Sequence, residues 1–198
     1  MGRRSDHSRA ELAELILSEA HVLMAEVGFQ AFSARGVAKR IGYSIGTIYN
    51  VFGSLDRLVL AVNSRTFVAW AALIRARLDA AGADRVAALV EGYFDFAEAN
   101  PHLWMAIYDH RLPPDAPFPE DYFRQRAELT GLVEAEIAAI LPAGRRDDAA
   151  ALARSLVAMV HGHCVFALNG TFALLGEADA RGAALARARE VLAAWGKG

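Results

Sequence analysis

The sequence predicts an all-α protein, and three observations support that prediction. Apolar residues recur at helical spacing along nearly the whole chain of 198 residues. No stretch bounded by turn residues alternates apolar and polar positions, as a half-buried strand does. With 55% hydrophobic residues, the chain is also long and apolar enough to bury a substantial core.

The first expected helix ends at Gly28. A glycine directly after the last residue of an apolar stripe is typical of a helix C-terminus, where the chain often takes a positive φ. The stripe consists of residues three or four positions apart: Leu12, Leu15, Ile16, Ala20, Leu23, Met24 and Val27.

A short second helix should follow, with Ser33 as its N-cap and Gly42 at its end. A serine hydroxyl can accept a hydrogen bond from an orphan amide of the first turn. The residues expected to face inward are Ala34, Val37, Ala38 and Ile41.

Ser44 can cap a third short helix, which ends at Gly53-Ser54. Its outward face carries Gly46, Thr47 and Asn50, with Tyr49 as the only bulky residue. The residues expected to turn inward are Ile45, Ile48, Val51 and Phe52.

The rest of the chain predicts a larger helical body. A long apolar-periodic segment runs from about residue 56 to 78. Further helices are expected at about 84–99, 101–110, 120–141, 146–175 with a break near 169–170, and 179–195. The proline-rich stretch RLPPDAPFPED is the one clear irregular loop.

Charge, cysteine content and the N-terminus restrict the function classes. The chain has 21 Lys and Arg against 23 Asp and Glu, so it offers no bulk cationic field, and any nucleic-acid contact has to be local. A single cysteine, Cys164, cannot form an internal disulfide, and the N-terminus does not have the pattern of a signal peptide. We therefore expect a cytoplasmic protein.

One uncharged stretch, residues 155–176, is long enough to span a bilayer. It contains His161, His163, Asn169 and three glycines, and the flanking segments are amphipathic. These features favour a helix buried in a core or a subunit interface, and we expect no membrane contact.

The two short helices, joined by Gly42-Tyr43-Ser44 and preceded by a longer helix, have the parts of a helix-turn-helix. A recognition helix with a slim outer face can enter a major groove about 12 Å wide. Basic residues of the N-terminal arm, among them Arg3 and Arg4, and of the middle helix are placed to flank a duplex. The alternatives are a purely structural helical hairpin and, for Tyr49, a core aromatic.

The stretch that supports a family resemblance is LILSEAHVLMAEVGFQAFSARGVAKRIGYSIGTIYNVFGSLDRLVLAV. It resembles the N-terminal domain of TetR-family transcriptional regulators: a helix, Gly-aromatic, a Ser-capped helix ending in Gly, then Ser-x-Gly-Thr-Ile-Tyr-x-x-Phe. The resemblance implies a three-helix DNA-binding domain, residues 1–54. It also implies a helical body, residues 55–198, that dimerises and in most members binds a small-molecule inducer.

The resemblance also assigns roles to single residues. Thr47 and Tyr49 match the usual phosphate contacts of the recognition helix, whereas Gly46 and Asn50 match the positions nearest the bases. The full set of expected DNA-binding residues is Ser33, Arg35, Lys39, Ser44, Gly46, Thr47, Tyr49 and Asn50.

Two positions depart from the family pattern, because Ile45 and Leu55 stand where a basic residue is common. Phosphate binding should therefore depend more on Arg35, Lys39 and the N-terminal arm. In the body, His161-Gly162 resembles the WHG-type C-terminal subtype, although Leu156 and Val157 stand where its tryptophan is expected.

The resemblance places the dimer contact on the last two long helices, at about 146–168 and 179–195. Aromatic and polar residues elsewhere in the body predict a pocket for a mostly apolar organic effector, although each of these residues could instead belong to the core. The predicted lining is Tyr93, Phe94, Phe96, Trp104, Met105, Tyr108, His161 and Phe166.

Metal and catalytic sites are not indicated. On a helix His161 and His163 point about 200° apart, so they cannot bind one ion together. Ser155 and His161 are nearly two turns apart, and we interpret Glu91 and Asp95 as a solvated edge. We expect no metal, no cofactor and no enzymatic activity.

We therefore expect a homodimeric, ligand-responsive transcriptional regulator. In this hypothesis it is a repressor, which a small apolar or aromatic effector releases from a palindromic operator in double-stranded DNA. Two alternatives stay open: a helix-turn-helix dimer without an effector, and a small helical enzyme or sequestering protein.

Overall fold

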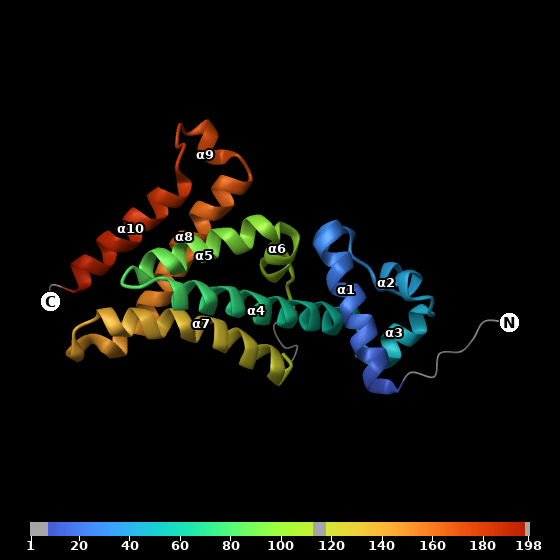
Figure 1. The fold of residues 1–198 in the computed structure, drawn as a ribbon. Coiled ribbons are helices and arrows are strands. Elements are labelled where there is room, and N and C mark those ends of the chain that lie inside the picture. The colour runs from blue at the N-terminus through green and yellow to red at the C-terminus, as the bar shows by residue number, and fades with distance from the viewer. Residues whose placement is uncertain (1–7, 113–117, 197–198) are drawn as a thin grey trace. The chain divides into compact units, whose positions relative to one another are not determined.

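The computed structural model describes residues 8–112 and 118–196, and within them every regular element is a helix (Figure 1). This confirms the all-α prediction. The helices are α1 Arg9–Ala31, α2 Ala34–Ile41, α3 Ile45–Phe52, α4 Leu55–Ala80, α5 Arg85–Ala99, α6 Pro101–Asp109, α7 Glu120–Ile140, the 3-10 helix η1 Ala143–Asp148, α8 Ala149–Leu168, α9 Thr171–Leu174 and α10 Ala180–Trp195.

The chain divides into two compact units. The first takes residues 1–67 and 100–125, and the second takes residues 68–99 and 126–198. Helices α4 and α7 therefore contribute residues to both units. The predicted boundary between the DNA-binding domain and the helical body, at residues 54 and 55, is a boundary between functions. A division by compactness does not test it, and it stays a prediction.

The predicted end of the first helix coincides with an interruption in α1. Gly28 has φ 72° and ψ 172°, which breaks the helical path there, and a short continuation follows to Ala31. Helix α6 lies against this break: the His102 ring donates from Nδ1 to the carbonyl of Ala25 (2.9 Å). That hydrogen bond satisfies a carbonyl near the break. At the other end of α1, Ser8 and Glu11 form a capping box.

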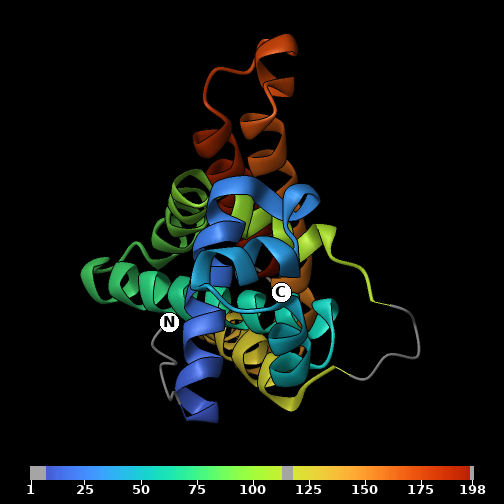
Figure 2. The same ribbon diagram turned by 90° about the vertical axis from the view of Figure 1, so that its right-hand side faces the viewer.

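The caps predicted for the two short helices, whose ribbons run from blue to cyan in Figure 2, are confirmed by their hydrogen bonds. Ser33 Oγ accepts from the Gly36 amide (3.1 Å), and Ser44 Oγ accepts from the Thr47 amide (3.2 Å). Gly42, at the end of α2, has φ +72° in the left-handed region. These three positions set where both helices begin and where the turn between them lies.

A single hydrophobic core holds α1, α2 and α3 together with residues of α4 and α6. Ile48 anchors α3 in this core with 0% exposure, and Val51 and Phe52 pack half-buried against it. The buried members are Ile16, Ala20, Leu23, Met24, Phe32, Ala34, Val37, Ala38, Ile48, Leu58, Val59, Val62, Leu103 and Ala106.

Two residues predicted to face inward are exposed. Ile45 is 39% exposed because it is the first residue of α3, and helical side chains tilt toward the N-terminus, so Ile45 points past the end of the packed face. Val27 is also exposed, next to the interruption at Gly28.

Polar contacts join α1 to α4 within the first unit. Arg65 forms an ion pair with Glu14 (2.5 Å), and the His21 Nε2 lies 3.3 Å from the Thr66 hydroxyl. Thr66 is fully buried and also donates to the carbonyl of Val62 (3.0 Å). Burial and, secondarily, the Arg65 guanidinium lower the pKa of His21.

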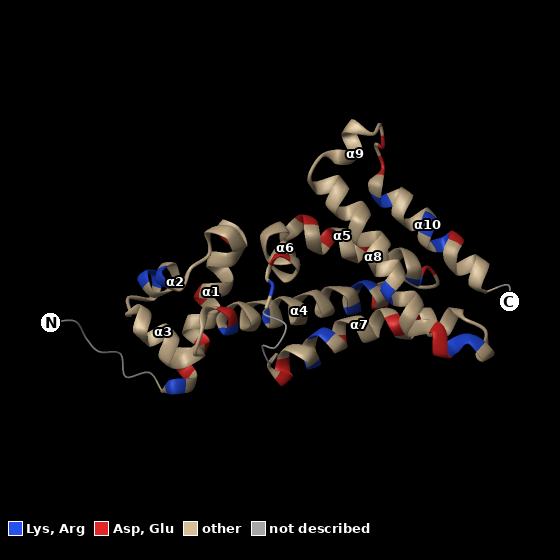
Figure 3. Cartoon of the chain, turned by 180° about the vertical axis from the view of Figure 1, so that it is seen from behind, with Lys and Arg blue, Asp and Glu red and all other residues tan. Residues whose placement is uncertain are grey.

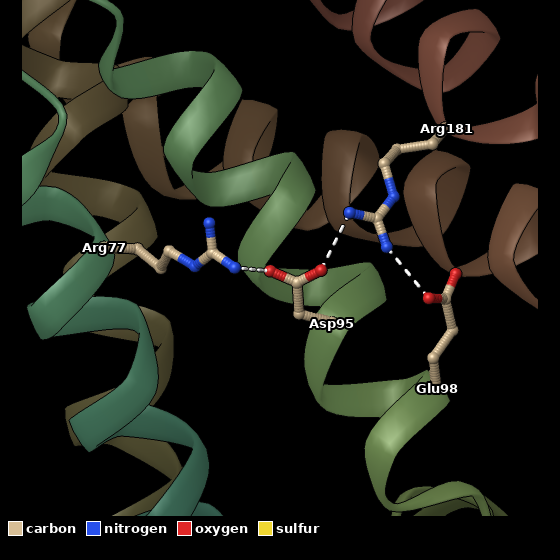
Figure 4. A network of polar contacts seen from close by, with 4 residues as sticks. All are labelled: Arg77, Asp95, Glu98 and Arg181. Carbon is tan, nitrogen blue, oxygen red and sulfur yellow. Dashed lines mark hydrogen bonds and ion pairs between the residues drawn. The ribbon is translucent and has the colours of Figure 1, made fainter.

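In the second unit α10 packs against α5 and α8, and α9 follows a break at Gly170, φ +77°, where the sequence predicts one. Asp95 of α5 connects two other helices (Figure 4). Its Oδ2 pairs with Arg77 of α4, and its Oδ1 accepts from Arg181 of α10 (2.7 Å). Glu98 holds the second amino group of Arg181 (2.9 Å). The interpretation of Asp95 as part of a solvated edge is therefore wrong, because its side chain is only 21% exposed.

Two helical stretches, Leu55–Ala80 and Ala143–Leu168, have the length and mean hydropathy that a membrane crossing needs. Core helices of globular proteins also meet this criterion. In the most apolar window of α4, 56% of the residues are buried inside the protein, and in the stretch that contains α8 the share is 28%. The apolar surface of α8 is thus only partly covered by this chain.

The proline-rich loop lies partly outside the described residues. Positions 113–117 are not described, and Glu120 and Asp121, the last two residues of the proline-rich stretch, begin α7, where the sequence predicts a helix from about 120.

Acidification should destabilise the first unit through His21. The pKa of this ring is lower in the folded state than in the unfolded state. Below about pH 6.5 the unfolded chain therefore binds a proton at His21 more readily than the folded chain does. We expect the free energy of unfolding, measured by urea denaturation, to fall from pH 7 toward pH 5. In His21→Gln the fall should be smaller. An equal pH dependence in both proteins would contradict the assignment to His21.

Candidate nucleic-acid interface and ligand site

The outward face of α3 is exposed and uncharged, and we call it the bare face. Gly46, Tyr49 and Asn50 are exposed, and Thr47 is half-buried with its hydroxyl 3.0 Å from that of Ser44. Tyr49 is 41% exposed, so it is not the core aromatic of the alternative interpretation. The helix thus shows its backbone, an amide and a phenol to its surroundings, which are groups that can bond base edges and phosphates.

Gly46 is not required by the fold. A Cβ at this position would meet only the Ser44 hydroxyl, at an ordinary contact distance of 3.5 Å. By contrast, a Cβ at Gly36 would lie 2.9 Å from a methyl group of Leu23, so that glycine serves the packing of α2 on α1. The missing side chain at Gly46 therefore affects the surface of α3 and leaves the interior unchanged.

Cations border this face on α2, where Figure 3 shows them beside the uncharged α3. Arg35 and Lys39 are exposed and form no ion pair with any residue in the described ranges. Arg40 differs from them, because it pairs with Glu26 of α1. Two cations of α2 are therefore available to phosphates. Arg3 and Arg4 of the expected N-terminal arm lie outside the described residues.

One basic residue near α3 was missed by the sequence analysis. Arg57 is exposed in the first turn of α4, and its side chain approaches Gly53, the C-cap of α3. Ser54 caps α4 by accepting from the Arg57 amide (3.1 Å). The sequence did contain a signal for it. Arg57 lies two residues after Leu55, the position where the family pattern has a basic residue, and Ser54 can cap the helix that carries Arg57.

Among the expected ligand residues, the structure brings Tyr93 and His161 together. The Tyr93 hydroxyl lies 2.9 Å from His161 Nδ1. Trp70 packs edge-on against Tyr93 and stacks on Phe96, with ring centroids 4.9 Å apart in both pairs. Burial lowers the pKa of His161, so this ring is neutral at neutral pH.

The other expected ligand residues are dispersed. Phe94 and Trp104 are almost fully buried, whereas Phe166 is exposed. Trp104 packs edge-on against Tyr108 (5.6 Å between centroids), and with Met105 these residues belong to the first unit. The expected set therefore divides between the two units.

An apolar recess lies in the second unit, between α5, α7, α8 and α10. The space between these helices amounts to about 440 Å³, a volume that includes open solvent, and Tyr93 is its only lining residue among those expected from the sequence. Its aliphatic lining was missed because such residues at helical spacing have the same pattern as an ordinary core.

The two histidines of α8 contact different groups, and its cysteine is buried. His163 donates from Nδ1 to the carbonyl of Met159 (2.9 Å), whereas His161 bonds Tyr93. Cys164 is fully buried, and burial raises its pKa to about 12. Within the described ranges no three potential metal-ligating side chains lie together.

The sequence matches two family models. Residues 16–62 match the model of bacterial regulatory proteins of the tetR family. Residues 86–189 match the model of the tetracyclin repressor-like, C-terminal domain. No curated protein matches the sequence.

Solved structures share the fold over nearly the whole chain. A protein of unknown function from Rhodococcus sp. RHA1 is 21% identical with a TM-score of 0.74, over 98% of this chain and 100% of that one. A TetR transcription regulator from Haloarcula marismortui is 18% identical with a TM-score of 0.63, over 94% and 98%. The multidrug binding protein EbrR, complexed with proflavin, is 22% identical with a TM-score of 0.61, over 91% and 99%.

Replacing Gly46 should separate stability from DNA binding. In Gly46→Ala we expect unchanged or higher stability, by up to about 1 kcal/mol, because alanine favours a helix and its Cβ meets only the Ser44 hydroxyl, at an ordinary contact distance. The affinity for a duplex that the wild-type protein selects should fall, because the methyl group lies where the helix backbone approaches the DNA.

Gly131→Ala is the matched control for this experiment. Gly131 lies in α7, and a Cβ there meets nothing within 4 Å. It should change stability in the same direction and leave the DNA affinity unchanged. Wild-type DNA affinity in Gly46→Ala would show that this face of α3 does not approach a duplex closely.

Proposed function

The chain belongs to the TetR family of transcriptional regulators, and we propose that it acts as a homodimeric repressor that a small apolar or aromatic effector releases from a palindromic operator. Family membership makes it a DNA-binding, helix-turn-helix regulator, and it supports our expectation that the chain is not an enzyme. The observation that carries the proposal is the bare face of α3, flanked by Arg35 and Lys39 of α2, which form no ion pair with the residues that the structure describes.

In the proposed complex α3 enters the major groove. Asn50 is the base reader, since an asparagine amide can form two hydrogen bonds with an adenine edge. Tyr49 and Thr47 donate from their hydroxyls to phosphates, and Arg35 and Lys39 neutralise phosphates beside the groove. Gly46 keeps the helix backbone close to the bases.

A dimer follows from the limited reach of one recognition helix. A helix of two turns reads few base pairs, and two copies on symmetric half-sites about 34–36 Å apart, or a multiple of that spacing, read enough for a specific operator. We assign the partner contact to α8 and α10. Support comes from the sparse burial of the apolar α8 stretch and from the exposed apolar side chains of Phe166, Leu168 and Val191.

Effector release is the second part of the proposal. An effector that prefers one arrangement of the body changes the spacing of the two α3 helices and so shifts the population away from the operator-binding form. Helix α4 is the proposed lever, because its residues belong to both compact units. EbrR, which shares this fold, is a multidrug binding protein, and that supports a ligand-binding body here.

Two substitutions in α3 test the DNA-binding roles. We expect Tyr49→Ala to weaken binding to all duplexes by a similar factor and to reduce the slope of log affinity against log salt, because it removes a phosphate contact. Asn50→Ala should weaken binding mainly to the selected operator, by about 1–3 kcal/mol, and so relax base preference. Electrophoretic or fluorescence titrations with selected and scrambled duplexes at several salt concentrations measure both effects. Identical losses on every duplex in the two variants would refute the assigned roles.

A further inference from the structure

The carboxylate of Asp95 holds two guanidinium groups that come from two other helices (Figure 4). Its Oδ2 accepts from Arg77 in the last turn of α4, and its Oδ1 accepts from Arg181 in the first turn of α10 at 2.7 Å. Glu98, three residues further along α5, accepts from the second amino group of Arg181 at 2.9 Å. Among these four side chains, Asp95 alone joins α4 to α10.

The charges of this cluster balance, with two guanidinium groups against two carboxylates. Asp95 is the least exposed of the four side chains, so water screens its two ion pairs less than it screens the pair made by Glu98. Charge-assisted hydrogen bonds of this kind are stronger than neutral ones. An asparagine could not do the same, because its amide has one acceptor oxygen and would turn its amino group toward the second guanidinium.

The start of α10 has few other supports. The short helix before it, α9, leaves Leu174 and Leu175 largely exposed. Asp179 caps α10, but it does so by accepting from an amide of α10 itself. The first buried side chain of α10 is Ala184, which offers a single methyl group. The hydrogen bonds of Arg181 therefore fix where α10 begins relative to α5.

We propose that Asp95 is a positioning residue for operator binding. It links the position of α10 to that of α4, and in this way it keeps the two recognition helices of the dimer at the spacing of the half-sites. The operator part rests on the proposed function, in which α10 is a dimer helix and α4 is the lever, whereas the link between α10 and α4 does not.

The link depends on both arginines. Because Arg77 holds one oxygen of Asp95, the carboxylate keeps one orientation, and Arg181 bonds to the other oxygen in that orientation. Without Arg77 the carboxylate can turn about its side-chain bonds. Arg181 then still contacts α5, but α10 is no longer fixed relative to α4.

Hydrogen exchange tests the link without DNA. In full-length Arg77→Met, the amides of residues 180–188 should exchange at least about threefold faster than in the wild type, because a change on α4 releases the start of α10. Asp95→Asn should have the same effect, so a folding defect in one variant leaves the other informative. Exchange in α1 should stay unchanged in both. Wild-type exchange of residues 180–188 in the folded variants would overturn the link.

Arg75→Met is the matched control. Arg75 lies two residues before Arg77 on α4, and it pairs with Glu128 of α7. Its replacement removes an ion pair of the same kind that does not reach Asp95. Residues 180–188 should therefore exchange at the wild-type rate, and faster exchange there would show that any loss of charge on α4 has this effect, which would also overturn the link.

The operator part is tested with two duplexes, one that carries both half-sites of the selected operator and one that carries a single half-site. Asp95→Asn and Arg77→Met should bind the full operator about threefold to tenfold more weakly, a range typical of residues that share one ionic network. Both should bind the single half-site as the wild type does, because α3 and its core are unchanged. Sedimentation confirms that each protein is dimeric at the concentration used.

The double variant separates one link from two independent contacts. Asp95→Asn combined with Arg77→Met should lose no more affinity for the full operator than Asp95→Asn alone, because the same link is broken in both proteins. Additive losses would show that Arg77 acts apart from Asp95 and would overturn the proposal.

The remaining outcomes separate the two parts. Equal losses on both duplexes, or loss of the dimer, would show that Asp95 serves stability alone, and the operator part would fail. If exchange in α10 responds but the preference for the full operator does not, the link stands and the operator part fails. If the wild type selects no two-fold symmetric sequence, the proposed function fails, and hydrogen exchange still decides the link.

Discussion

A helix of two turns has too few hydrogen bonds to persist alone in water, and the function of this chain depends on how α3 is nevertheless held. The burial of Ile48 under α1 and α2 fixes one side of α3, and serine and glycine caps fix its ends. Both supports use the inner face and the termini only. The packing of α3 therefore does not require particular side chains on its outer face. Gly46, Tyr49 and Asn50 are free to serve contact with DNA.

Much of the first unit could be predicted from the sequence because its signals are local. A serine two residues after a glycine, as in Gly42-Tyr43-Ser44, specifies a left-handed turn and a helix start by itself. The errors arose at helix ends. Periodicity placed Ile45 inside because it ignores the tilt of helical side chains, and this tilt decides burial in the first turn. The His102 bond to the Ala25 carbonyl could not be foreseen, since it joins residues far apart in the sequence.

The second unit was less predictable because its recess depends on how four helices pack. Val86, Leu89, Val90 and Tyr93 follow the pattern of any buried helix face, and only the distance to α7, α8 and α10 makes them the wall of a recess. Aromatic residues were the more obvious candidates, yet Phe94 and Trp104 are almost fully buried and do not line this recess. Asp95 was also misjudged, because its partners Arg77 and Arg181 come from two other helices. The same carboxylate thus ties α4, the proposed lever, to α10, a proposed dimer helix.

The central claim is that two copies of the bare face of α3 read a symmetric site in duplex DNA. Selection of bound fragments from a random duplex library by the full-length protein, followed by sequencing, tests it most directly. The account predicts enriched sequences with two-fold symmetry, whose half-sites are separated by about one helical turn or a multiple of it. Enrichment of a single unpaired half-site, or no enrichment over the starting library, would contradict it.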